Sequence, residues 1–399
     1  MMTVRKIKDY LGYFADFVGY FAMRFLSLWA RRTTKYHNLW LISERKTDAR
    51  DNAYHFFEYI CREHPEINAV YAIEHSSRDY DRAASLGRTV EPNSFEHLLA
   101  FACAKVCVST HIMGCAPNTY SFARLDGLLG FVRTKKVFLQ HGVIENDCTE
   151  LHYPSARLDL FVCTALPEYD FIKNNFGHPS GVVQMLGLCR YDRLLTAHEV
   201  KRQILVMPTW RIFLRNMTDA EFEKSDYFRE YGALINSERT AKILADNDYE
   251  LVFYMHYELQ KFSHLFRTDN PHIKIATFEK YDVQRLLMES ALLITDYSSI
   301  LFDFAYMKKP AAYFWFDEDE FFGDHYKRGY FNCKTDGFGP VFEKSEPLIN
   351  FAEQCIKGGA EMSQEYLSRA NEFFDFDENG KKSNCEKTYE AIKNLVDKQ

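Results

Sequence analysis

The sequence predicts an α/β protein with two doubly wound parallel sheets, each covered by helices on both faces. Its 399 residues suffice for two domains of roughly 150–200 residues each. From residue 36 onward, short apolar stretches alternate with helical ones, and the alternation restarts near residue 200. Such alternation is typical of βαβ units, whose strands lie parallel. Hydrophobic residues make up 47% of the chain, which supplies two large cores.

Charge and cysteine content exclude several classes of protein. The net charge of −7 provides no global basic field for phosphates, so we expect no nucleic-acid partner. Ten cysteines occur without paired Cys-x-x-Cys spacing, which argues against a zinc site and favours free thiols in a reducing cytoplasm. Asp16 and Arg24 interrupt the apolar N-terminal region, and no cleavage pattern follows it, so no secretory signal is predicted.

Residues 1–35 are predicted to form an amphipathic, membrane-associating helix. Apolar residues recur there at spacings of three and four, which gives one helical stripe. The stripe consists of Leu11, Phe14, Val18, Phe21, Phe25 and Leu28. Basic residues before, within and after it suit the anionic inner face of a cell membrane, where the protein would lie peripherally. The alternative is a helix that packs against its own domain.

Residues 36–198 form the predicted N-terminal domain. Its expected strands are 38–42, 69–73, 105–109, 137–140, 158–163 and 182–185, and its expected helices are 53–63 and 94–102. Residues 199–375 form the second domain. Its expected strands are 203–207, 251–255, 273–276, 291–295 and 311–316, and its expected helices are 233–246, 281–289 and 300–307. In residues 376–399, a last helix (386–396) is expected to pack back toward the domain junction.

The turn between the strand 291–295 and the helix 300–307 is a candidate anion site. It reads Asp296-Tyr297-Ser298-Ser299. The first turn of a helix has free N–H groups, and the two serines add hydroxyl donors. Ligands in open α/β sheets bind beyond the carboxyl ends of strands, where this turn lies. The alternative is a simple N-cap, with Asp296 as a turn residue.

Further polar residues follow other predicted strands. His141-Gly142 ends the strand 137–140, and a histidine that titrates near neutrality is suited to act as a general base. A strand-end histidine with a structural role is the alternative. In the second half, Pro208-Thr209-Trp210-Arg211 and His256 follow two strands. With the 296–299 turn they predict a pyrophosphate site along one rim of the sheet. No metal site is predicted, although Asp296 and Asp303 could approach a divalent cation.

The same residues carry a family resemblance. The stretches FLQHG (138–142), MPTWR (207–211), YMH (254–256) and LLITDYSSILFDFAYMKKP (292–310) occur in this order. With GLCRYD (187–192), GFGPVF (337–342) and DENGKKS (377–383), they resemble the CDP-glycerol glycerophosphotransferases, which are teichoic-acid primases and polymerases. The resemblance covers roughly residues 38–395 and implies a GT-B-like fold, in which two Rossmann-like domains face a cleft.

The resemblance implies a transferase that moves glycerol phosphate, or a related polyol phosphate, from a CDP-activated donor to a cell-surface glycopolymer. The donor would be CDP-glycerol or CDP-ribitol, and the acceptor a lipid-linked or polymeric glycan such as teichoic acid or capsule. His141 and His256 would be catalytic. The predicted donor-binding residues are Gly142, Pro208, Thr209, Arg211, Asp296, Ser298 and Ser299. Two alternatives stay open: a GT-B glycosyltransferase that uses a nucleotide sugar, and a catalytically idle binding subunit of an assembly complex.

Overall fold

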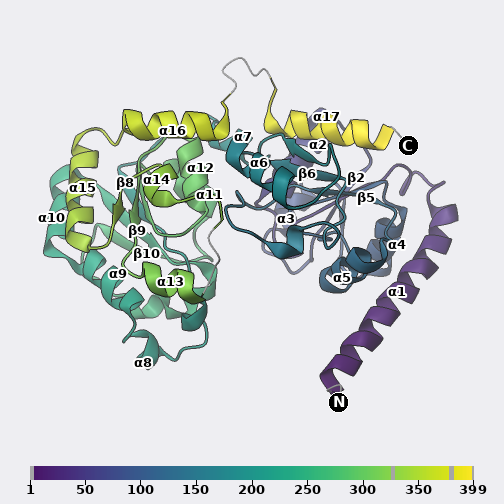
Figure 1. Cartoon of the computed structure of the whole chain (residues 1–399), viewed down its shortest axis with the longest axis horizontal. Coiled ribbons are helices and arrows are strands. Elements are labelled where there is room, and N and C mark those ends of the chain that lie inside the picture. The colour runs from purple at the N-terminus through teal and green to yellow at the C-terminus, as the bar shows by residue number, and fades with distance from the viewer. Residues whose placement is uncertain (1–3, 325–328, 377–381, 398–399) are drawn as a thin grey trace. The chain divides into compact units, whose positions relative to one another are not determined.

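The computed structural model describes residues 4–324, 329–376 and 382–397, which fall into two compact units (Figure 1). Unit 1 contains residues 1–143, 148–192 and 377–399, and unit 2 contains residues 144–147 and 193–376. Each unit holds one parallel sheet with helices packed against it. The predicted fold class, with two doubly wound parallel sheets, is confirmed.

The sheet of unit 1 has the strand order β3-β2-β1-β4-β5-β6-β7. Its strands are β1 (Trp40–Ser43), β2 (Ala69–Ala72), β3 (Thr89–Val90), β4 (Val106–Ser109), β5 (Lys135–Phe138), β6 (Leu160–Cys163) and β7 (Val183–Met185). Strands β1, β4 and β6, which each have a neighbour on both sides, are buried along their whole length, as expected where helices cover both faces of a sheet.

The helices of unit 1 include one from the far end of the chain. They are α1 (Val4–Ala30), α2 (Asn52–Glu63), α3 (Tyr80–Ala84), α4 (Phe95–Cys103), α5 (Thr119–Leu129), η1 (Thr149–Leu151), α6 (Leu166–Asn175), α7 (Tyr191–Leu194) and α17 (Asn384–Asp397). α17 lies beside α2 (Figure 1). Its Tyr389 ring stacks on His64 at 3.6 Å between ring centroids, and Ile392 and Val396 join the core under the sheet.

The sheet of unit 2 has the order β10-β9-β8-β11-β12-β13. Its strands are β8 (Gln203–Val206), β9 (Glu250–Tyr254), β10 (Ile273–Ala276), β11 (Leu292–Thr295), β12 (Ala311–Phe314) and β13 (Val341–Phe342). Its helices are η2 (Ile212–Leu214), α8 (Asp219–Phe222), α9 (Asp226–Asn236), α10 (Glu238–Asn247), η3 (Tyr257–Leu265), α11 (Val283–Glu289), α12 (Ile300–Tyr306), α13 (Glu318–Asp324), α14 (Cys333–Asp336), α15 (Ser345–Lys357) and α16 (Gln364–Phe374).

The predicted helix 233–246 is wrong as a single element. α9 ends at Asn236 and α10 begins at Glu238. Between them Ser237 is extended, and its side chain accepts a hydrogen bond from the Thr240 N–H at 3.4 Å. A serine in this position satisfies a free N–H at the start of a helix, so the second helix begins there instead of continuing the first.

Helix α1 packs against α4 and α5 through one face. Tyr20 and Ser27 on that face are buried. The side chains of residues 4–11, including Leu11 of the predicted stripe, lie outside the described ones. The rest of the stripe is exposed, namely Phe14, Val18, Phe21, Phe25 and Leu28, although the Phe21 ring also stacks with Phe131. Among the described helices, none has the length and apolarity needed to cross a membrane.

Candidate active site

Two histidines lie together at the carboxyl edge of the unit 1 sheet. Strands β4 and β5 are neighbours, with Ser109 opposite Phe138, so the residues that follow both strands meet at one edge. His111 follows β4 and His141 follows β5. Their rings are parallel within 6°, and the ring centroids are 5.3 Å apart. His141 is exposed and His111 half-buried, so solvent reaches the predicted base.

Gln140 fixes the backbone directly before His141. Its φ of 60° places it in the left-handed region, and this turn ends the strand at Phe138, two residues earlier than the sequence predicts. The Gln140 side chain is buried and donates to the Val162 carbonyl of β6. The main-chain carbonyl of Gln140 accepts a hydrogen bond from the Asn52 side chain at 2.9 Å. These contacts hold the loop against both neighbouring elements, so the position of His141 is determined by the core.

Arg190 ties the His141 loop to the start of α2. Its Nη1 donates to the His141 carbonyl and to Oδ1 of Asp51, both at 2.8 Å. Its backbone N–H donates to the Asn52 side chain at 3.0 Å. Asn52 therefore accepts from Arg190 and donates to Gln140. This network orients the loop through its main chain and leaves the His141 ring open.

The Gly-x-x-Arg-x-Asp element at 187–192 has a structural explanation. Gly187 has a φ of 81°, and a Cβ there would lie 2.2 Å from the Asn384 side chain, so only glycine fits. Asp192 accepts hydrogen bonds from the backbone N–H groups of Asn384 and Cys385, both at 2.8 Å, and thereby caps the start of α17. The element positions Arg190 and anchors the last helix of the chain in unit 1.

The environment lowers the pKa of both histidines. Although the His141 side chain reaches the surface, desolvation by the surrounding protein atoms lowers its pKa below the usual value; Arg190 and Arg45 add to the effect, and Asp51 opposes it. Burial, His141 and Arg45 lower the pKa of His111 to about 4. A histidine with a lowered pKa is unprotonated at neutral pH. His141 is therefore in the form that accepts a proton.

The predicted rim of unit 2 is brought together by three adjacent strands. β8 lies between β9 and β11, so the 208–211 segment has His256 on one side and the 296–299 turn on the other. The rings of Trp210 and His256 stack with their centroids 6.1 Å apart. Pro208 and Thr209 are buried, and the Thr209 N–H donates to Asp296 Oδ1 at 2.7 Å.

Arg211 is wholly buried between two carboxylates. Its guanidinium contacts Asp296 at 3.0 Å and Asp317 at 2.7 Å, and it donates to the Thr209 carbonyl at 2.9 Å. The rings of Tyr297 and Phe321 lie 5.0 and 4.9 Å from its Cζ. The two carboxylates hold the Arg211 pKa above its usual value despite burial, while burial raises the pKa of Asp296.

This arrangement bears on the predicted donor-binding roles of Arg211 and Asp296. Both side chains are 0% exposed, and their charges are directed at each other. A buried ion pair of this kind orients the segments that carry it. Here it joins the ends of β8, β11 and β12, and it supports the turn that presents Ser298 and Ser299.

Ser298 and Ser299 are the part of this turn that reaches the surface. Both are half-buried, and Ser299 starts α12 without a capping hydrogen bond from its side chain. Within the described residues, neither hydroxyl has a hydrogen-bond partner. The simple N-cap alternative for these serines is therefore not supported, and both hydroxyls remain available to a ligand.

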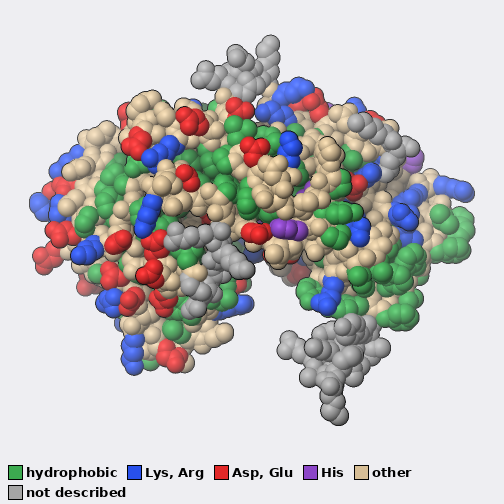
Figure 2. Space-filling model, viewed as in Figure 1, with side chains coloured by type: hydrophobic (Ala, Val, Ile, Leu, Met, Phe, Trp, Pro, Cys, Tyr) green, Lys and Arg blue, Asp and Glu red, His purple; other side chains and the backbone are tan. Residues whose placement is uncertain are grey.

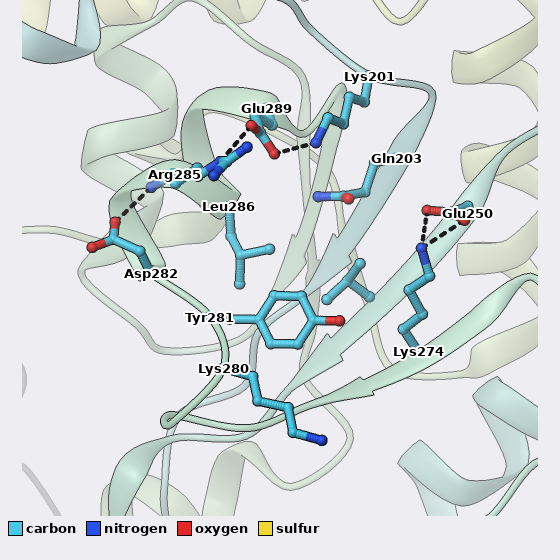
Figure 3. Close-up of a pocket in the computed structure, with 11 residues that line it drawn as sticks. Lys201, Gln203, Glu250, Lys274, Lys280, Tyr281, Asp282, Arg285, Leu286 and Glu289 are labelled. Atoms are coloured by element: carbon cyan, nitrogen blue, oxygen red, sulfur yellow. Dashed lines mark hydrogen bonds and ion pairs between the residues drawn. The ribbon is translucent and has the colours of Figure 1, made fainter.

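A cavity of about 340 Å³ in unit 2 lies at the opposite edge of the sheet (Figure 3). Gln203 and Glu250, the first residues of β8 and β9, line it. Most of the charged side chains that line it form ion pairs with one another: Glu289 pairs with Lys201 and Arg285, and Glu250 pairs with Lys274. The predicted phosphate-binding rim is not part of it. Across the residues that the structure describes, no group of three or more His, Cys, Asp or Glu side chains is arranged to hold a metal ion.

Comparison with known families addresses the resemblance directly. A family model described as CDP-Glycerol:Poly(glycerophosphate) glycerophosphotransferase matches residues 23–393. The chain belongs to this family. The resemblance predicted from the sequence is confirmed. Of the motifs that carried it, residues 377–381 of the DENGKKS segment lie outside the described residues.

Curated relatives of this family take part in teichoic acid synthesis. The chain is 30% identical over 380 residues to the minor teichoic acid biosynthesis protein GgaB of Bacillus subtilis (strain 168), a match that covers 90% of this chain and 40% of the relative. It is 28% identical over 175 residues to the teichoic acid glycerol-phosphate transferase of Staphylococcus aureus, which covers 44% of this chain and 40% of the relative. The matched region thus spans about 40% of the length of either relative.

Solved structures in this family share the fold. The wall teichoic acid polymerase TagF matches with a TM-score of 0.66 and 18% identity, and the match covers 100% of both chains. A further TagF structure, of a histidine variant soaked with CDPG, matches with the same TM-score. At this identity, the similarity establishes the fold alone.

Three supporting residues were missed by reasoning from the sequence. His111 stands two residues after the predicted strand 105–109, and Asp317 directly follows the predicted strand 311–316. The strand-end rule that singled out His141 and His256 applies equally to both. Arg190 lies in a motif that was noted for its resemblance only, and nothing in its spacing indicates a contact with the His141 loop.

Proposed function

We propose that this chain transfers glycerol phosphate, or a related polyol phosphate, from a CDP-activated donor to a cell-surface glycopolymer and releases CMP. The observation that carries the proposal is the family match over residues 23–393. The local geometry supports it, because His141 of the predicted His-Gly element is open to solvent and has a lowered pKa.

In the proposed reaction, His141 acts as the general base. An acceptor hydroxyl attacks the β-phosphorus of the donor, and its proton passes to a ring nitrogen of His141. The new oxygen–phosphorus bond replaces the bond to the bridging oxygen, and CMP leaves with that electron pair. General-base assistance of this kind typically accelerates a reaction by about 10²–10⁴.

The donor contacts are proposed to come from the unit 2 rim. The Ser298 and Ser299 hydroxyls and the His256 ring would donate to the pyrophosphate, with Thr209 and Pro208 shaping the adjoining backbone. Arg211 and Asp296 would support this rim from inside the unit, as their complete burial requires. Each hydrogen bond to a charged phosphate contributes roughly 1.5–3 kcal/mol.

The proposed place of action is the inner face of the cell membrane, where the protein would lie peripherally. The exposed apolar stripe on α1 supports this location, because Phe14, Phe25 and Leu28 are each more than half exposed. In Figure 2, hydrophobic side chains gather on the part of this helix that is drawn in colour. The polymer acceptor, of the teichoic acid or capsule type, would be reached from this surface.

The test is product analysis with a panel of donors. The purified protein is incubated with CDP-glycerol, CDP-ribitol and sugar nucleotides in the presence of a short soluble glycerol-phosphate acceptor. The proposal expects CMP release with a CDP-polyol and extension of the acceptor. Release of UMP or UDP from a sugar nucleotide would instead establish a glycosyltransferase, and release of no nucleotide would favour the idle subunit.

A further inference from the structure

A second cavity, in unit 1, is lined by basic side chains. It has a volume of about 680 Å³ and lies where the end of α1 meets the end of α4 and the starts of β4 and β5. Five cationic residues line it: Arg24, Arg31, Arg32, Lys105 and Arg133. The described lining contains no carboxylate. Because β4 and β5 begin here, the cavity lies at the sheet edge opposite to His111 and His141.

Helix capping accounts for only two of these charges. Arg24 and Arg31 both donate to the Ala102 carbonyl near the end of α4, each at 2.9 Å, which is a common use of arginine at a helix terminus. This shared acceptor brings two like charges together, and burial and the charge of Arg24 lower the pKa of Arg31. Like charges held together without a carboxylate are stabilised when an anion binds between them.

Two polar atoms in the cavity wall lack partners. Nε of Arg31 and Oγ1 of Thr134 are buried without a hydrogen-bond partner among the described residues. Within the described residues, no ion pair is formed by Arg32, Lys105 or Arg133. Buried donors are normally satisfied. The cavity therefore offers donors and positive charge to an anion with several acceptor oxygens, such as a phosphate group.

The cavity adjoins the exposed apolar surface. On α1, Phe25, Leu28 and Trp29 are 61%, 58% and 53% exposed, and they stand beside Arg24, Arg31 and Arg32 in the sequence. Phe131, two residues before Arg133, packs against Phe17 of α1 at 5.2 Å between ring centroids. A free phosphate ion has no apolar part that could contact these side chains. A phospholipid has both a phosphate group for the cavity and acyl chains for the apolar surface beside it.

We propose that this cavity binds the phosphate headgroup of an anionic phospholipid while the α1 stripe contacts the acyl region. The inference deepens the proposed membrane location and rests on it. It adds a discrete headgroup site, formed by Arg24, Arg31, Arg32, Lys105 and Arg133. Binding at this site would orient unit 1 on the membrane with its amino edge toward the lipid.

The test is co-sedimentation of the full chain with vesicles. One set contains equal parts of phosphatidylglycerol and phosphatidylcholine, and the other contains phosphatidylcholine alone. The double variant Arg31→Gln/Arg133→Gln removes two cavity charges. The matched control Arg62→Gln/Arg78→Gln removes two exposed charges elsewhere in unit 1. At roughly 1 kcal/mol for each basic residue at an anionic surface, the cavity variant should lose about thirtyfold in affinity for anionic vesicles.

The control variant should lose much less affinity for anionic vesicles. Inorganic phosphate, added at constant ionic strength, should weaken vesicle binding by the wild type but not by the cavity variant. Equal losses in both pairs, or binding unaffected in both, would overturn the headgroup site. If the double variant melts non-cooperatively, the single variant Arg133→Gln replaces it in the same assay, because Arg133 is exposed. Phe25→Ser tests the apolar contact separately. CMP release on a soluble acceptor should persist in the cavity variant, so failure of this site and failure of the transferase proposal are distinguishable.

Discussion

Unit 1 and unit 2 each use an arginine near the carboxyl edge of a parallel sheet, but in opposite ways. Arg190 binds the main chain of the His141 loop and the side chain of Asp51, so the imidazole beyond it stays exposed. Arg211 is enclosed by Asp296, Asp317 and aromatic rings, whereas the serines of the adjoining turn reach the surface. The two motif arginines therefore make their contacts inside the protein, one with the main chain of a loop and one with buried carboxylates. The units differ in which group is left open: a histidine ring in one, serine hydroxyls in the other.

The largest effect is expected at the open base of unit 1. His141→Ala should lower turnover by about 10²–10⁴ because general-base assistance is lost. Initial rates of CMP release from CDP-glycerol measure this. His75→Ala, an exposed histidine of the same unit whose ring contacts Glu91 and Tyr80, is the control and should retain full activity. Near-wild-type turnover in His141→Ala would remove the residue from the mechanism.

The buried arginine of unit 2 should matter for stability. Arg211→Met keeps the approximate volume but leaves Asp296 and Asp317 unpaired in the interior. Removal of one partner from a buried ion pair typically costs about 3–5 kcal/mol. Denaturant unfolding of the variant measures the loss. The control Arg229→Met, at an exposed position on α9, should change stability by less than about 0.5 kcal/mol. A fully stable Arg211→Met protein with weakened donor binding would place the guanidinium on the donor instead.

Smaller effects are expected for the groups that reach the surface of unit 2. Ser298→Ala and His256→Ala should each weaken CDP-glycerol binding by about 10- to 100-fold, which corresponds to one hydrogen bond to a charged group. Calorimetric titration with the donor measures the affinity, and His272→Ala in the same unit is the control. Unchanged affinity in both variants means that the pyrophosphate binds elsewhere.

The smallest effects concern the pH profile set by the neighbours of His141. The base is active when unprotonated, so kcat/KM should fall as the pH drops through the His141 pKa, which lies below the usual histidine value. Arg190 lowers this pKa and Asp51 raises it. Arg190→Gln should therefore move the acidic limb to higher pH, and Asp51→Asn should move it to lower pH. Shifts in the same direction would contradict the electrostatic assignment.

Much of the fold was predictable because apolar strands and strand-end polar residues are local signals. The strand 273–276 was predicted with the bounds of β10, and the three segments of the unit 2 rim followed from strand order. The direction of the Arg211 side chain was not predictable, since Asp317 lies 106 positions away. The end of β5 also depends on tertiary contacts, because Gln140 turns where Asn52 and Val162 hold it.

The contrast between the two edges is tested most directly by two quantities measured on one variant. In His141→Ala, the Kd for CDP-glycerol is determined by calorimetry and turnover by CMP release on the same preparation. We predict a Kd within about twofold of the wild type together with a turnover reduced by about 10² or more. A Kd that rises in proportion to the loss of turnover would show that His141 holds the donor, and it would contradict the assignment of base and donor contacts to different units.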